Sequence, residues 1–330
     1  MKFIEDLKKH TIILFFITVI VLYFVLKDDF SSTVKALQNL DWIYIIIAFF
    51  FYAFSVFIRA YINYRITNNK KKITLREALK HNIITQFFNG VTPFSTGGQP
   101  MEIYMLTEHD ISVASATNQV VQSFLFYQIA LVACGVIAII YNFFFPIFPT
   151  VKVLRYFVLL GFIINTLVVI GLILVSSSKK IGEKILKGIV KILKKLKIKV
   201  SEKNLQKKIE DYYNGFQEMK KRKGFLTMGV LGNVVSLLCL YAVPIFILYA
   251  MHDFSSLNIV ETLVASAYVY IMGSFIPIPG ASGGIEYGFT QFFGNFISIS
   301  KIAAVVLVWR FITYYLGIII GAIVFNLERR

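Results

Sequence analysis

The sequence predicts an all-α membrane protein that crosses the bilayer several times, and three observations point to this fold class. Hydrophobic residues make up 57% of the 330 residues, above the about 45–50% of a soluble domain. Charged residues make up only 16%, against about 25% in soluble domains. Several apolar runs approach the about 20 residues that a helix needs to cross a bilayer. This composition excludes a disordered chain, because disorder requires low hydrophobicity.

Six apolar runs are predicted as full transmembrane helices. They are Thr11–Leu26, Trp42–Tyr64, Ser115–Tyr141, Val153–Val175, Phe225–Ala250 and Ile302–Phe325. The first run follows a basic segment, as the apolar part of a signal peptide does. It is followed by Lys27, Asp28 and Asp29 instead of a small-residue cleavage site, so we expect an uncleaved span.

The basic residues of the loops predict the orientation of these spans. The N-terminus, residues 65–80, residues 179–223 and the C-terminal Arg329-Arg330 are rich in Lys and Arg, whereas residues 27–41, 141–152 and 251–258 hold three Lys and no Arg. Basic loops remain in the cytoplasm. We therefore expect a multi-pass protein of the cytoplasmic membrane with both termini inside.

Two further apolar stretches, Ala78–Leu106 and Ile259–Phe296, are interrupted by Gly and Pro. The orientation requires each to enter and leave on one side, either as a re-entrant hairpin or as a pair of full crossings. Residues 96–106 are too short to cross, so we expect a re-entrant hairpin for the first stretch. The second stretch is longer, and both forms remain open.

The two broken stretches contain similar motifs. Residues 93–98 read PFSTGG and residues 279–284 read PGASGG, and Glu102 and Glu286 follow four and two residues later. Their flanking spans have opposite predicted orientation, which indicates an inverted repeat, an architecture typical of transporters. We expect one membrane domain over residues 1–330, with a first repeat at about 42–175, a basic cytoplasmic loop at 179–223 and a second repeat at about 225–325.

The Gly-Gly turns are candidate binding elements, because irregular backbone at membrane depth is tolerated where it lines a cavity or is buried in protein. A helix that begins there directs its positive end at an anion. The candidate substrate-binding residues of the turns are Thr96, Gly97, Gly98, Ser282, Gly283 and Gly284. The alternative is that these turns only cap helices or allow close packing.

Residues 92–102 and 277–286 resemble the paired motifs of the lysylphosphatidylglycerol synthase transmembrane region, the MprF-like flippase domain family. The resemblance covers nearly the whole chain. It implies a flippase-like lipid translocase that moves a phospholipid or an aminoacylated or lipid-linked headgroup between leaflets, with a connection to antibiotic resistance.

The alternative function is the membrane component of a phosphatidylglycerol lysyltransferase, which makes an aminoacylated lipid and confers resistance to cationic peptides. In bifunctional members of the family a soluble domain performs that synthesis. This chain ends at Arg330, directly after the last predicted span, so we expect translocation and no enzymatic step. A non-transporting lipid scaffold or receptor is a third class.

Ionisable residues within the spans are costly and are therefore candidates for function. Arg310 lies deep in the last span, and its candidate partners are Glu286, Glu102 or a lipid phosphate. Glu102 and Glu286 are candidates for binding a cationic headgroup or a proton. The alternative for Arg310 is a structural Arg–Glu pair. Arg59 is near enough to the inner end of its span to extend to the interface, which favours a structural role.

Gln119, Gln122 and Tyr314 are candidate cavity-lining residues, with hydrogen bonding between helices as the alternative for the two glutamines. Neither a Walker A motif nor GxGxxG occurs, and the four His and two Cys show no metal-ligand spacing. We therefore expect no cofactor, no metal and no catalytic residue.

The loop at residues 179–223 contains 16 of the 34 basic residues and only five acidic ones. Its first half has apolar residues on one helical face and lysines on another, which predicts a basic amphipathic helix on an anionic membrane surface. The expected partners are membrane lipids, with a separate synthase chain and a second copy of this chain as further candidates. Nucleic acid is not expected as a partner.

Overall fold

The computed structural model describes residues 30–67, 73–147, 152–184, 188, 190, 201–222, 224–254, 258–294, 296–297 and 299–328. Within these residues the chain is helical and contains no strand. The elements are α2 (Phe30–Gln38), α3 (Trp42–Thr67), α4 (Leu75–Val91), η2 (Pro93–Ser95), α5 (Gly98–Thr107), α6 (Val113–Phe144), α7 (Lys152–Ser177), α9 (Glu202–Lys220), α10 (Phe225–Ala250), α11 (Ile259–Gly273), η3 (Pro279–Ala281), α12 (Gly284–Phe293), α13 (Ile299–Arg310), η4 (Phe311–Tyr315) and α14 (Leu316–Glu328).

Five of the described helices are long and apolar enough to cross a membrane, and each contains a predicted span. They are Trp42–Thr67, Val113–Phe144, Val153–Ser176, Phe225–Ala250 and Lys301–Glu328. The all-helical, multi-pass fold class is therefore confirmed. The predicted first span, Thr11–Leu26, and most of the predicted basic amphipathic helix lie outside the described residues.

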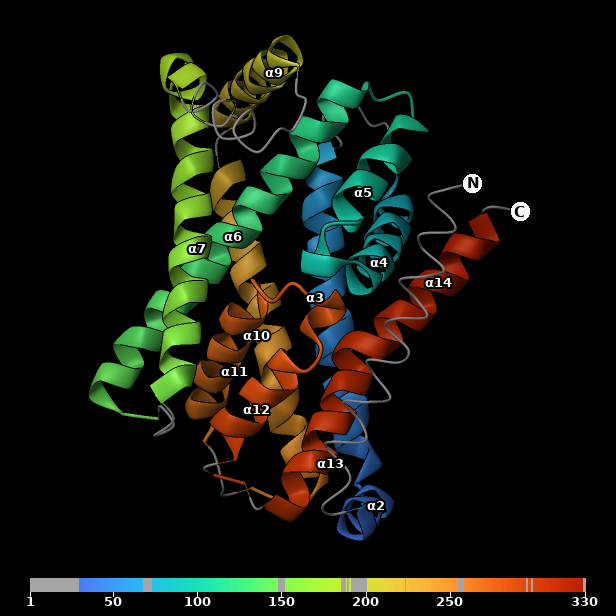
Figure 1. The fold of residues 1–330 in the computed structure, drawn as a ribbon. Coiled ribbons are helices and arrows are strands. Elements are labelled where there is room, and N and C mark those ends of the chain that lie inside the picture. Colours follow the sequence, from blue (N-terminus) through green and yellow to red (C-terminus); the bar gives the residue numbers. More distant parts are fainter. Residues whose placement is uncertain are drawn as a thin grey trace.

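Each broken stretch forms a hairpin of two short helices (Figure 1). Helices α4 and α5 come to the middle of the bundle from the end where α9 lies, and α11 and α12 come from the opposite end, where α2 lies. Helices α5 and α12 have ten residues each, which is about half the length needed to cross a bilayer. The second stretch therefore has the hairpin form, not that of two full crossings.

The two hairpins begin in the same way. Thr74 and Glu77 form a capping box at the start of α4, and Asn258 and Glu261 form one at the start of α11. Such a box satisfies backbone N–H groups that the first turn of a helix leaves free. Glu261 thus has a structural role at the start of its hairpin.

The two hairpin turns have the same backbone conformation. Pro93 and Pro279 each start a short 3₁₀ turn, and the next residue is left-handed, with φ 54° and ψ 16° at Phe94 and φ 61° and ψ 15° at Gly280. The third residue, Ser95 or Ala281, is also left-handed. Because non-glycine residues rarely adopt positive φ, a shared pair of left-handed positions is a specific similarity.

The packing partners of the two halves correspond to one another. Helix α4 packs against α3 and α14, and α11 packs against α10 and α6. Helix α5 contacts α6, and α12 contacts α13. The spans α3 and α10 lie against each other, and η2 contacts η3 where the hairpin turns meet. Helix α7 packs outside this arrangement, on α6, α11 and α9.

Candidate functional site

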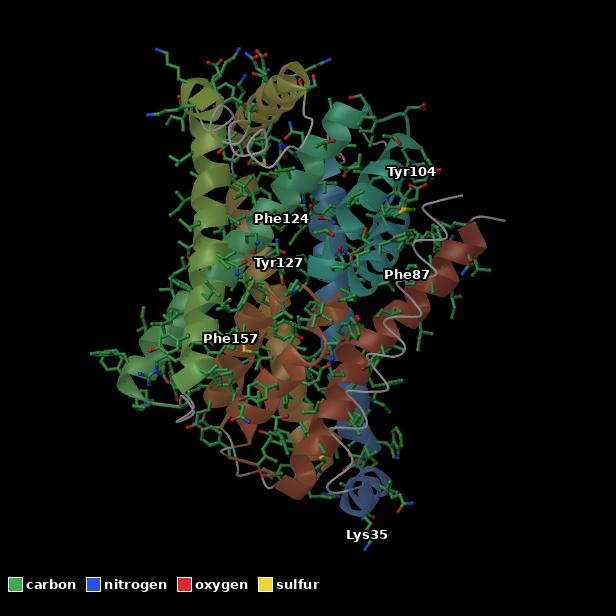
Figure 2. The ribbon with its side chains drawn as sticks, in the orientation of Figure 1. Lys35, Phe87, Tyr104, Phe124, Tyr127 and Phe157 are labelled. Atoms are coloured by element: carbon green, nitrogen blue, oxygen red, sulfur yellow. The ribbon has the colours of Figure 1, made fainter. Side chains whose placement is uncertain are left out.

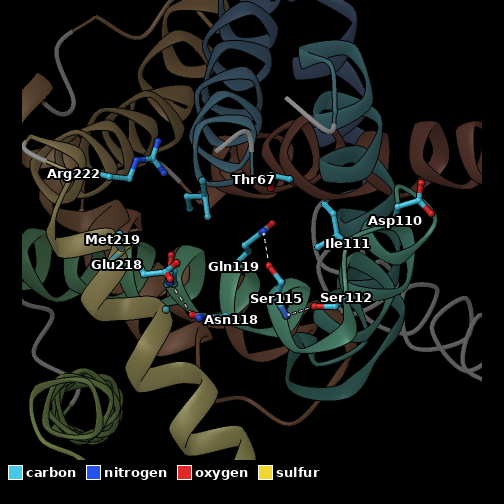
Figure 3. A pocket seen from close by; sticks show the side chains of 13 residues that line it. Thr67, Asp110, Ile111, Ser112, Ser115, Asn118, Gln119, Glu218, Met219 and Arg222 are labelled. Atoms are coloured by element: carbon cyan, nitrogen blue, oxygen red, sulfur yellow. Dashed lines mark hydrogen bonds between the residues drawn. The ribbon is translucent and has the colours of Figure 1, made fainter. Parts of the chain in front are cut away.

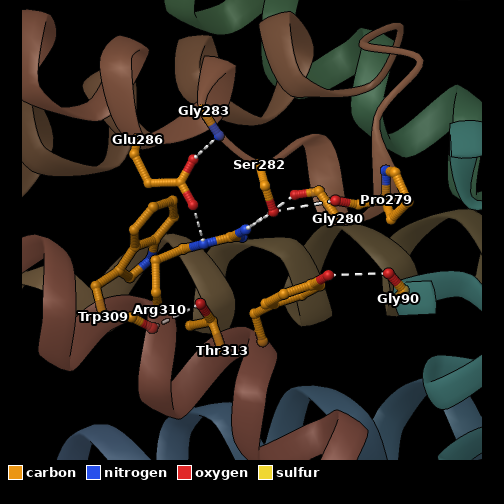
Figure 4. Close-up of polar contacts among 10 residues, drawn as sticks. Gly90, Pro279, Gly280, Ser282, Gly283, Glu286, Trp309, Arg310 and Thr313 are labelled. Atoms are coloured by element: carbon orange, nitrogen blue, oxygen red, sulfur yellow. Dashed lines mark hydrogen bonds and ion pairs between the residues drawn. The ribbon is translucent and has the colours of Figure 1, made fainter. Parts of the chain in front are cut away.

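The second hairpin turn is built around a buried ion pair between Arg310 and Glu286 (Figure 4). Arg310 Nε lies 2.7 Å from Glu286 Oε1, and the two side chains are 6% and 4% exposed. The other carboxylate oxygen of Glu286 accepts a hydrogen bond of 2.7 Å from the Gly283 N–H. Of the two carboxylates expected as partners of Arg310, Glu286 is the one that pairs with it.

The guanidinium of Arg310 also binds the turn itself. It donates to the Gly280 carbonyl at 3.0 Å and to Ser282 Oγ at 3.3 Å, and Ser282 Oγ in turn donates to the Pro279 carbonyl. These contacts give the left-handed turn a cationic partner in a buried location. Because the Arg310 guanidinium is both ion-paired and hydrogen-bonded, it can remain charged in a buried, low-dielectric location.

Tyr314 joins this cluster to the first hairpin. The Arg310 guanidinium lies over its ring, 4.1 Å from Cζ to the ring centroid, and the Tyr314 hydroxyl donates to the Gly90 carbonyl at the end of α4 at 2.9 Å. Residues 311–315 form a turn of π-helix between α13 and α14. Such turns occur frequently at functional sites, because they change which side chains face a neighbour.

The Gly-Gly pair of the first turn is hydrogen-bonded within its own hairpin. The Gly97 N–H donates to Thr92 Oγ1 at 2.8 Å, and the Gly98 N–H donates to Asn89 Oδ1 at 2.9 Å. Thr96 Oγ1 donates to the Pro93 carbonyl. In this conformation these groups stabilise the hairpin, as the Gly283 N–H does in the second turn.

Glu102 occupies a different position from Glu286. Its carboxylate accepts a hydrogen bond of 2.9 Å from Asn63 Nδ2 of α3, and Asn63 Oδ1 accepts from Ser123 Oγ of α6. Among the described residues Glu102 has no ion-pair partner within 4.0 Å. The two carboxylates of the repeated motif therefore differ: Glu286 is neutralised by Arg310, whereas among the described residues Glu102 accepts one hydrogen bond, from the Asn63 amide, and forms no ion pair.

A cavity of about 540 Å³ lies between the two hairpin turns and the spans around them. Of the predicted residues, Thr96, Glu102, Arg310 and Tyr314 line it. Gly97, Gly98, Ser282, Gly283, Gly284 and Glu286 lie in or beside the turns but not on its wall. Phe124 and Tyr127 of α6, also on its wall, lie at mid-height of the bundle in Figure 2.

Most of the polar lining comes from residues that the sequence reasoning did not select. Arg59 of α3 faces this cavity, with its guanidinium 5.0 Å from the centroid of the Tyr127 ring, although the sequence favoured the membrane interface for it. The other polar residues on the wall include Asn63, Asn82, Gln86, Asn89, Gln99, Ser123 and Asn233. The available signal was the presence of amide side chains inside apolar helices, where each is costly without a partner.

Gln119 and Gln122 line a second, smaller pocket of about 350 Å³ near the start of α6 (Figure 3). Gln119 Nε2 donates to Ser115 Oγ, and Gln122 Nε2 donates to Asn118 Oδ1. Asn118 Nδ2 in turn donates to the Asp211 carbonyl of α9. The two glutamines therefore line a pocket other than the central cavity. Gln122 takes part, through Asn118, in hydrogen bonding that connects α6 to α9, whereas the Gln119 bond stays within α6.

Comparison with known proteins places these features in a family. The family model described as "Lysylphosphatidylglycerol synthase TM region" matches residues 11–321. A "UPF0104 membrane protein" of Archaeoglobus fulgidus is 24% identical over 314 residues, which cover 89% of each of the two chains. The family match covers both hairpins and four of the five described spans, and it reaches residue 321 in the fifth.

Proposed function

The chain belongs to the lysylphosphatidylglycerol synthase TM region family, and on that premise we propose that it is a lipid translocase. It moves a phospholipid, or a lipid with a modified headgroup, between the leaflets of the cytoplasmic membrane. The basic residues around α9 lie on the cytoplasmic side, where anionic lipids attract them.

The central cavity is the observation that carries this proposal. A lipid headgroup is polar and cannot cross the hydrocarbon core unaided, because burying a charge without partners is costly. The cavity offers amide, hydroxyl and charged groups midway between the ends of the bundle, between helices whose outer faces are apolar. The acyl chains remain in the lipid while the headgroup occupies the cavity.

The paired hairpins support an alternating-access mechanism. Two hairpin turns of the same backbone conformation meet at the cavity from opposite ends of the bundle. In inverted-repeat transporters, the substrate site lies between the repeats, and movement of one repeat against the other exposes it to each side in turn. Here the hydrogen bond from Tyr314, in the turn between α13 and α14, to Gly90 of the first hairpin is a contact that such a movement must break or rebuild.

We test the proposal by filling the cavity. Ser123→Phe places a ring into the cavity wall, and we expect it to slow movement of a tail-labelled lipid in proteoliposomes by at least about tenfold, which corresponds to about 1.4 kcal/mol in the barrier. The measurement is loss of fluorescence from the outer leaflet on adding a membrane-impermeant quencher. Ile137→Phe, on the outward face of the same helix, is the matched control and should behave as wild type.

Equal rates for wild type, Ser123→Phe and protein-free vesicles would exclude this function. A lysyltransferase would instead transfer label from charged tRNA to lipid when this chain is the only protein present.

A further inference from the structure

We propose that the cavity recognises a zwitterionic headgroup, in which one phosphate contacts Arg59 and one ammonium contacts Glu102. This inference rests on the proposed function and adds the chemical class of the substrate. It follows from the charges on the cavity wall, of which there are three among the described residues: Arg59, Glu102 and Arg310.

Arg310 is not available for a ligand charge, because its charge is already neutralised by Glu286. Arg59 differs. Its contact on the cavity wall is with the face of the Tyr127 ring, and no ion pair or hydrogen bond to it occurs within the described residues. A guanidinium stacked on a ring keeps its in-plane N–H donors free, and the geometry of these donors matches a phosphate.

Glu102 is the complementary group. One of its oxygens accepts the Asn63 amide, which leaves the other oxygen without a hydrogen-bond donor among the described residues. Asn63 lies one helical turn after Arg59 on α3, so the two charges are adjacent on the wall. They form no ion pair with each other within 4.0 Å.

A free cation and a free carboxylate on one cavity wall are both costly at membrane depth. A ligand that carries the opposite two charges neutralises both at once, whereas a purely anionic headgroup leaves Glu102 unpaired and adds a repulsive charge. Two further tyrosines, Tyr52 and Tyr270, line the same cavity, and an aromatic ring attracts an ammonium at its face.

The test compares tail-labelled phosphatidylethanolamine with phosphatidylglycerol in the same proteoliposomes. We expect wild type to move the amine lipid at least about tenfold faster, because a site built for charged hydrogen bonds rejects a ligand that lacks one partner. Glu102→Gln should slow the amine lipid but not the glycerol lipid, whose repulsion it removes, and Arg59→Gln should slow both. The matched controls are Glu108→Gln at the exposed end of the same hairpin and Arg76→Gln at the start of α4.

Equal movement of the two lipids by wild type, or an unchanged ratio in Glu102→Gln, would overturn the zwitterion assignment and leave the translocase function intact. If no lipid moves, the translocase function fails, and binding of short-chain forms of the two lipids in detergent then tests the headgroup assignment alone. Stronger binding of free phosphoethanolamine than of the short-chain amine lipid would assign the site to a soluble solute and overturn the lipid assignment.

Discussion

Arg310→Ala is expected to destabilise the folded protein by about 3–5 kcal/mol, because removing one partner of a buried ion pair leaves an uncompensated charge. Here the charge left behind is Glu286, whose side chain is only 4% exposed. The turn would also lose the donor that binds Gly280 and Ser282. The measurement is the unfolding midpoint of the detergent-solubilised protein, by heat and by SDS titration.

The exposed ion pair between Lys80 and Glu328 is the matched control. Its two side chains are each 37% exposed at a distance of 2.6 Å, so Lys80→Ala should cost no more than about 1 kcal/mol. The double variant Arg310→Met/Glu286→Gln should recover more than half of the loss, because it removes both charges and keeps an acceptor for the Gly283 N–H. A single Arg310→Ala variant as stable as Lys80→Ala would show that the buried pair does not maintain the turn.

Gly280→Ala is expected to destabilise the protein by about 1–3 kcal/mol and to reduce lipid movement, because a new Cβ would overlap the Tyr314 ring. Displacing that ring removes its contact with Arg310 and its hydrogen bond to Gly90 in the other hairpin. The positive φ of 61° at Gly280 adds strain for any L side chain. Melting midpoint and transport rate are measured together.

The first hairpin turn distinguishes the overlap with the Tyr314 ring from the strain of a positive φ. Phe94 has the same left-handed conformation with φ 54° and carries a large side chain, so the turn conformation alone tolerates a Cβ. Phe94→Gly should therefore be neutral or slightly stabilising, while Tyr314→Phe should reproduce only the loss of the hydrogen bond. If Gly280→Ala behaves like wild type in both measurements, the Tyr314 contact is not required for the meeting of the hairpins.

The sequence predicted those parts of the fold that depend on local composition. Hydropathy located five spans that the structure describes, within a few residues of their ends, because each apolar run must remain in lipid over its whole length. Proline and glycine located both breaks, because each of these residues destabilises the interior of a helix. The motif that follows each break was also visible, as was the cost of placing Arg310, Glu286 and Glu102 in apolar surroundings.

The candidate site was predicted only in part, because hydropathy and periodicity do not determine how helices are rotated against each other. Arg59 had the same local context as a residue that extends to the interface, yet it faces the cavity beside Tyr127. Gln119 and Gln122 had the spacing of a cavity wall, but they face a separate pocket near α9. The N–H groups of Gly97 and Gly98 have acceptors in Thr92 and Asn89 that no spacing rule predicts.

By itself, the sequence determined that this protein lies in a membrane, where its helices cross and which few charges are costly enough to be informative. Only the tertiary structure decided which charges neutralise each other. Arg310 and Glu286 come from separate helices and pair where the second hairpin meets α13, whereas Arg59 and Glu102, both on the cavity wall, form no ion pair with any residue that the structure describes. The reason is physical: hydropathy is a property of each segment, but the energy of a charge depends on whichever groups the packed helices place around it.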